Sequence, residues 1–187
     1  MLTFDSEKHE YRWHGQIVPS VTQVLKHGGQ ISDFSINDFA AQQGTAVHAA
    51  CALLAYNRLD LASVDQRILG YVLSYWSFLG SVGWKIDSVE QQRYCEDHRY
   101  AGTWDVLFDG HLVDIKTGAP AKWHALQTAA YWRLAGKPVG VRRHSLYLDS
   151  NGKTPRLVEH KDRTDLPTFL KLVEDYHGIE RNPDEKR

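Results

Sequence analysis

Two aspartates, Asp105 and Asp114, lie on either side of a turn signal in the stretch GTWDVLFDGHLVDIKTG, residues 102–118. Asp-Gly at 109–110 is the strongest short signal for a two-residue hairpin turn, and strand formers flank it on both sides. A turn at this point places Asp105 directly opposite Asp114. Because like charges directly opposite each other destabilise a sheet, the pair predicts a compensating divalent cation, Mg²⁺ or Mn²⁺.

Side chains alternate between the two faces of a strand, so the hairpin divides into two faces. One face is predicted to carry Thr103, Asp105, Leu107, Leu112, Asp114 and Lys116. The other is predicted to belong to the core and to carry Trp104, Val106, Phe108, Val113 and Ile115. Lys116 therefore points the same way as the acid pair, where it is able to orient or deprotonate an attacking water or to stabilise a pentacovalent phosphate.

The bulk composition favours one ordinary globular domain. The chain has 187 residues, of which 42% are hydrophobic and 24% charged, and a net charge of −1, so no global basic field points to nucleic acid. Its two cysteines, Cys51 and Cys95, are too few for a disulfide framework or a four-cysteine iron–sulfur cluster. No apolar signal segment and no membrane-length apolar run is present. We expect a soluble, cytoplasmic protein with no membrane partner.

Hydrophobic periodicity and turn signals predict the order of the elements. Helices are expected over 20–27, 35–59, 65–84, 120–136 and 163–178, and strands over 85–95, 103–108 and 111–116, with hairpins at 10–20 and 140–161. This order predicts an α/β (α+β) domain with a central mixed β-sheet flanked by helices.

Three motifs in this order carry a resemblance to a known family. "GTWD", "VDIKTG" and "QTAAYW" resemble the PD-(D/E)XK nuclease superfamily and are most similar to its RecB-like exonuclease branch, which includes phage and CRISPR-associated exonucleases. The match touches residues from about 44 to 132. The iron–sulfur cysteines of some relatives are absent, which argues against the cluster-bearing subgroup.

The resemblance implies a role for each matching residue. Asp105, Asp114 and the carbonyl of Ile115 would bind the metal, and Lys116 would be the catalytic lysine. The remaining implied residues are His48 as a further metal ligand, Glu90 in a supporting or second-metal position, and Gln127 and Tyr131 at the phosphate or against the lysine. Gln127 and Tyr131 are four residues apart and so share one helical face.

The resemblance also implies an organisation and an activity. The whole chain, 1–187, would be one restriction-endonuclease-like domain, with an N-terminal hairpin and short helix (1–37), a nuclease core (38–177) and a tail (178–187). The activity would be Mg²⁺- or Mn²⁺-dependent hydrolysis of DNA, by an exonuclease rather than an endonuclease, in repair, recombination or mobile-element processing. DNA ends or single strands would be the partner, with a possible recombination or repair protein. A basic and aromatic path for DNA is predicted from Lys122, Trp123, Arg133, Arg142 and Arg143.

The same residues allow other interpretations. Asp114 and Lys116 could form an ordinary surface ion pair, and His48 could be a packed histidine. His48 and Cys51, with Cys95 and His98, could instead bind one tetrahedral zinc ion. The alternative function is a non-catalytic DNA- or partner-binding module on the nuclease fold.

Overall fold

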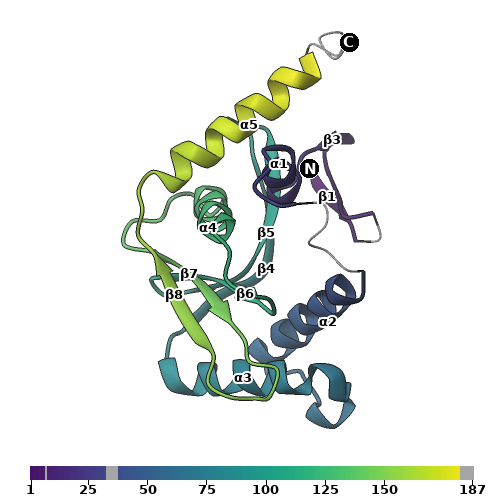
Figure 1. Cartoon of the computed structure of the whole chain (residues 1–187), viewed down its shortest axis with the longest axis vertical. Coiled ribbons are helices and arrows are strands. Elements are labelled where there is room, and N and C mark those ends of the chain that lie inside the picture. The colour runs from purple at the N-terminus through teal and green to yellow at the C-terminus, as the bar shows by residue number, and fades with distance from the viewer. Residues whose placement is uncertain (7, 33–37, 182–187) are drawn as a thin grey trace.

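A five-stranded mixed sheet forms the centre of the computed structural model, which describes residues 1–6, 8–32 and 38–181. In spatial order its strands are β4 (Ile86–Cys95), β5 (Tyr100–Phe108), β6 (His111–Lys116), β7 (Arg142–Tyr147) and β8 (Arg156–His160). Strands β6 and β7 are parallel, and the other neighbours are antiparallel. The predicted α+β class with a central mixed sheet is confirmed (Figure 1).

Helices cover both faces of this sheet (Figure 1). Helices α1 (Val21–His27), α4 (Trp123–Leu134) and α5 (Asp165–Arg181) pack on one face, and α2 (Asp38–Ala55) and α3 (Gln66–Val82) pack on the other, with a short 3₁₀ turn at Leu61–Ser63 between them. Helix α5 runs on through residue 181, three residues beyond the predicted helix end at 178. No helix in the described part of the chain has the length and apolar character to cross a membrane.

A second, three-stranded antiparallel sheet occupies the N-terminal region. It contains β1 (Leu2–Asp5), β2 (Glu10–Trp13) and β3 (Gln16–Val18). The predicted hairpin at 10–20 corresponds to β2 and β3, whereas β1 was not predicted. A capping box at Ser20 then starts α1, because its hydroxyl accepts the amide of Gln23 and its own amide donates to the Gln23 side chain.

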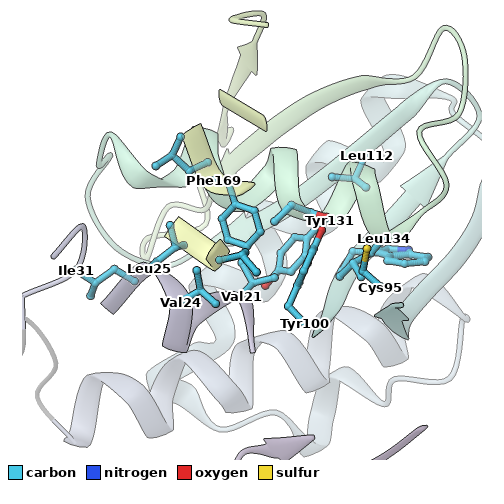
Figure 2. Packing of buried hydrophobic residues seen from close by; sticks show 14 residues of the cluster. Val21, Val24, Leu25, Ile31, Cys95, Tyr100, Leu112, Tyr131, Leu134 and Phe169 are labelled. Carbon is cyan, nitrogen blue, oxygen red and sulfur yellow. Dashed lines mark hydrogen bonds between the residues drawn. The ribbon is translucent and has the colours of Figure 1, made fainter. Parts of the chain in front are cut away.

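The apolar core divides into two layers, one on each face of the central sheet. The layer under α1, α4 and α5 is built around Tyr100, Phe169 and Leu112 (Figure 2). The layer under α2 and α3 is built around Phe108 and Ile115, both fully or almost fully buried. The sheet is thus buried on both faces, and polar side chains in its interior need partners.

The alternation of faces along β5 changes at Asp105. Val106 and Phe108 lie in the layer under α2 and α3, as predicted, but Trp104 lies in the opposite layer. The prediction that Trp104 shares a face with Val106 is therefore wrong. The neighbouring strand explains the difference, because Glu90, which lies between the register positions of Trp104 and Val106, has a φ of +50°. This left-handed residue breaks the regular pleat of β4 beside Asp105.

Candidate active site

The hairpin that carries the two acids forms as the sequence predicts. Gly110 has a φ of +77°, a left-handed conformation that glycine adopts without steric cost, and Phe108 pairs with His111 across the turn. The ladder between β5 and β6 includes the pair Val106–Val113 and ends there. Beyond this pair a side-chain hydrogen bond takes the place of backbone pairing, because Asp105 Oδ2 accepts the amide of Ile115 at 2.6 Å. Asp105 is therefore fixed across the hairpin by its side chain.

A histidine and a glutamate complete one side of the site. His48, on α2, contacts Asp105 through Nδ1 and Oδ1 at 2.9 Å. Glu90, on β4, lies close enough that one ligand atom from each of the three side chains falls within 4.8 Å of the others. Within the described ranges this is the one group of three or more His, Cys, Asp or Glu side chains with such spacing.

The second acid lies with the lysine on the other side. Asp114 is 2% exposed, and its Oδ2 lies 2.7 Å from the Lys116 ammonium. The Asp114 carboxylate is therefore paired with Lys116 and shielded from solvent. A buried carboxylate oxygen of this kind retains capacity for a further electropositive ligand.

Lys116 is held in turn by α4. Its Nζ donates to Gln127 Oε1 at 2.6 Å, and Gln127 Nε2 donates to the Tyr131 hydroxyl at 3.0 Å. The topology explains this arrangement, since α4 connects the parallel strands β6 and β7 and crosses over the sheet face towards which Lys116 points. The four-residue spacing of Gln127 and Tyr131 places both on the helical face that covers the site.

The charges in the site depend strongly on one another. Burial lowers the pKa of His48, but the charge and hydrogen bond of Asp105 outweigh this effect and raise it to about 9. Burial raises the pKa of Asp105, but three groups outweigh this effect and bring the pKa below its ordinary value. They are the charge and hydrogen bond of His48, the charge of Lys116 and the hydrogen bond from the Ile115 amide. Burial raises the pKa of Asp114 to about 6 despite Lys116. Burial and the Asp105 charge raise the pKa of Glu90 to about 7.

A cavity of about 290 Å³ opens between the N-terminal sheet, α1 and α4, and Thr103 and Tyr131 are among the residues that line it. None of the described residues that line it is acidic, and Lys8 and Lys26 supply cationic groups near His9. The other lining residues are Phe4, Tyr11, Ser20, Val21, Thr22, Gln23 and Gly102. The two lysines therefore give this cavity a lining that favours an anionic group.

The sequence did not indicate that the N-terminal sheet contributes to this site. The Tyr11 hydroxyl hydrogen-bonds the Thr103 hydroxyl over 2.6 Å, two residues before Asp105. The two residues are 92 positions apart. Tyr11 is an aromatic residue on a short strand, so no local pattern distinguishes it from an ordinary core residue.

The residues present fit a divalent cation. Asp105, Asp114 and the Ile115 carbonyl offer oxygen ligands, which Mg²⁺ and Mn²⁺ prefer, and His48 adds a nitrogen. The specific observation is the spacing of His48, Glu90 and Asp105, whose ligand atoms lie within 4.8 Å of one another. The zinc site proposed from Cys51 and Cys95 is excluded, because these two buried cysteines belong to core layers on opposite faces of the sheet.

The predicted DNA path does not form one continuous row in the structure. Lys122 and Trp123 lie at the start of α4. The ring centroid of Trp123 is 5.1 Å from the Nζ of Lys116. Arg133 lies in the last turn of α4, about 15 Å further along the helix axis, and forms an ion pair with Asp97.

The two remaining arginines lie at the start of β7. Arg142 is the register partner of His111, about 16 Å along the strands from the pair Lys116–Tyr147. Arg143 is held by the Asp165 carboxylate at 2.8 Å and by two backbone carbonyls, a pattern typical of a structural contact. A role for these arginines in binding DNA stays a prediction.

Comparisons with known proteins give distant structural similarities. The crystal structure of SSO0001 is similar with a TM-score of 0.43 and 17% identity, over 86% of this chain and 84% of that chain. LHK-Exo, an alkaline exonuclease from Laribacter hongkongensis, is similar in the crystal structure of its complex with dAMP. The TM-score is 0.36 and the sequence identity is 13%, over 91% of this chain and 95% of that chain. A second structure of that exonuclease has a TM-score of 0.33 and 14% identity, over 90% of this chain and 94% of that chain. No family model and no curated protein matches the sequence. Similarities at this level define neither a family nor an activity for the chain.

Proposed function

We propose that the chain is a metal-dependent deoxyribonuclease that hydrolyses phosphodiester bonds, of the PD-(D/E)XK type and its RecB-like branch. The observation that carries the proposal is the arrangement of Asp105, Asp114 and Lys116. Two buried carboxylates and one ammonium group lie at one end of a hairpin. Burial raises the pKa of Asp114 even with Lys116 beside it, so a further cation at this carboxylate would stabilise its ionised form.

Asp105, Asp114 and the Ile115 carbonyl would hold Mg²⁺ or Mn²⁺, with His48 as a further ligand. When bound, the ion supplies polarisation of a phosphoryl oxygen and acidification of a water molecule. Glu90, beside His48 and Asp105, would support this shell or contribute to a second ion. The hydrogen bond from Ile115 to Asp105 fixes that carboxylate before any ligand arrives, which reduces the reorganisation that binding requires.

The remaining residues act on the phosphate. Lys116 directs its ammonium group into the site, where it would orient the water or stabilise the negative charge that develops on the phosphate. Gln127 and Tyr131 hold Lys116 from α4, because the amide of Gln127 is itself oriented by the tyrosine hydroxyl. These residues therefore define the position of the charged group relative to the two acids.

The lining of the cavity between the N-terminal sheet, α1 and α4 supports a polyanionic substrate. The chain has a net charge of −1, yet the described lining of this cavity contains cationic groups and no acid. Together with the resemblance of the sequence motifs to RecB-like exonucleases, this lining supports our inference that the chain acts at DNA ends or on single strands, as an exonuclease.

The test is a cleavage assay on end-labelled linear DNA and closed circular DNA with Mg²⁺, Mn²⁺ or EDTA. We expect metal-dependent loss of linear DNA, survival of the circle, and a loss of at least about 100-fold in Lys116→Ala. Lys171→Ala, an exposed position on α5, is the matched control. Equal cleavage by Lys116→Ala, or cleavage in EDTA, refutes the proposed mechanism. DNA affinity that EDTA leaves unchanged, with no cleavage product, would favour the non-catalytic binding module instead.

A further inference from the structure

The Lys116 ammonium has three neighbours that differ in chemistry. Asp114 contributes a negative charge at 2.7 Å, Gln127 contributes a neutral carbonyl oxygen at 2.6 Å, and Trp123 presents its ring with the centroid 5.1 Å away. The last distance lies within the range of a cation–π interaction. Lys116 is also largely shielded from solvent, with a side chain 13% exposed, so the ring attraction acts in a partly desolvated environment.

A bound divalent cation would change this balance. Asp114 is one of the residues that would hold the ion, so its carboxylate would no longer be available to the lysine alone. The ion would also add a positive charge nearby, which repels the ammonium. The two neighbours with no formal charge, Gln127 and Trp123, are not among the residues that would bind the metal, so their contacts with Lys116 would not be shared with it. They would keep Lys116 in place after Asp114 is shared.

We propose that Trp123 is a positioning residue that holds the Lys116 ammonium in the metal-loaded enzyme by a cation–π contact. This inference rests on the proposed function for its catalytic consequence, whereas the contact itself is independent of activity. The proposal assigns Trp123 a role different from the one that sequence predicts, contact with a DNA base. A role through Lys116 affects the rate of cleavage, whereas base contact affects the affinity for DNA.

The ring of Trp123 is connected to strand β7 through His124. His124 packs edge-on against it, with ring centroids 4.1 Å apart. The Nδ1 of His124 accepts the Ala121 amide at 3.3 Å and lies 2.8 Å from the Tyr147 hydroxyl, with which it shares a hydrogen bond. Tyr147 is the register partner of Lys116 in the parallel pair β6–β7. His124, which packs against the ring, is therefore held by the strand that neighbours the lysine, and this restricts the position of the ring relative to Lys116.

The direct test uses ¹⁹F NMR of protein labelled with 5-fluorotryptophan. The chain has six tryptophans, and Trp123→Phe identifies the resonance of Trp123. We expect Lys116→Met to shift this resonance while leaving that of Trp132 in place. Trp132 is a matched control because it lies on the same helix and donates its indole N–H to Pro138. We also expect the Trp123 resonance to respond to Lys116→Met when Mg²⁺ is present.

The kinetic test is a double-mutant cycle with Trp123→Leu and Lys116→Met, measured as single-turnover cleavage and as DNA affinity in Ca²⁺. A cation–π contact predicts a rate between about 2- and 30-fold lower for Trp123→Leu, with DNA affinity within about 2-fold of the unmutated chain. Trp123→Phe should recover much of the rate. In the Lys116→Met background Trp123→Leu should cause no further loss, because the residue it acts through is already absent.

Two results would overturn the proposal. One is a Trp123 resonance that Lys116→Met leaves unchanged. The other is a rate loss from Trp123→Leu that is equally large in the Lys116→Met background, or that is replaced by weaker DNA binding. If the unmutated chain cleaves no DNA, the proposed function fails, but the NMR result still decides whether Trp123 holds the lysine. If Trp123→Leu does not fold, Trp123→Phe and the NMR comparison remain decisive.

Discussion

Asp114→Asn should make the metal-free protein more stable while it removes the proposed activity. Asp114 is 2% exposed, and burial raises its pKa from 3.8 to about 6 although Lys116 lies beside it. Above pH 6 the folded protein therefore holds an ionised group that prefers to be neutral. Asparagine has nearly the same shape and no charge, so the substitution removes that cost. The shift corresponds to about 3 kcal/mol as an upper value.

The sign of the pH dependence follows from this shift. A carboxyl group with a raised folded-state pKa binds more protons when folded than when unfolded between about pH 4 and 6, so the wild-type protein loses stability as pH rises through that window. The gain from Asp114→Asn is complete above pH 6, falls to about half at pH 5 and disappears near pH 4. For a chain of this length, 3 kcal/mol corresponds to roughly 6–12 °C in Tm.

The assay is thermal unfolding in EDTA at pH 8 and pH 5, followed by titration with Mn²⁺ at pH 8. Wild type should gain about 4 kcal/mol when Mn²⁺ reaches 1,000 times its Kd, whereas Asp114→Asn should gain much less, so that the order of stability reverses. Asp109→Asn is the matched control, since Asp109 is exposed in the turn of the same hairpin and Asn-Gly suits that turn equally well. A less stable Asp114→Asn at pH 8 in EDTA would refute the reasoning.

Two further predictions concern α3 and the pH dependence of metal binding. A Cβ on Gly70 would lie 1.8 Å from the Ser150 carbonyl oxygen, so Gly70→Ala should lower the free energy of unfolding by about 1–3 kcal/mol. Gly80→Ala on the same helix meets nothing within 4 Å and should raise it by up to about 1 kcal/mol in chemical denaturation. Because His48 has a pKa of about 9 and must lose its proton to bind a metal, Mn²⁺ affinity by calorimetry should fall about tenfold per pH unit below pH 8, and His48→Gln should weaken that dependence.

Local patterns were sufficient to predict much of this architecture. The Asp-Gly turn with strand formers on both sides predicted the hairpin, and the four-residue spacing of Gln127 and Tyr131 predicted that both share a helical face. These features depend on residues close together in the chain. The predicted mixed sheet followed from the order of strands and helices, because a helix between β6 and β7 permits a parallel pair.

Features that depend on distant contacts were not predicted. The left-handed conformation of Glu90 changes which face Trp104 occupies, and a glutamate gives no sequence signal for a positive φ. The hydrogen bond between Tyr11 and Thr103 joins segments 92 residues apart and makes the N-terminal sheet one wall of the cavity. Arg143 looked like a basic surface residue, but it is held by Asp165, which only the packing of α5 brings close.

The topology explains why the chemistry gathers at one end of β6. Asp114 and Lys116 are two residues apart on one strand, and the connection from β6 to β7 brings α4 over the same face. The hairpin partner of β6 adds Asp105, and α2, from the opposite layer, adds His48. Each element is stabilised by its own core contacts, so the fold can hold two carboxylates close together although like charges repel each other. We expect a site assembled in this way to keep the arrangement of its strands and helices when a cation binds, because core packing determines the positions of those elements.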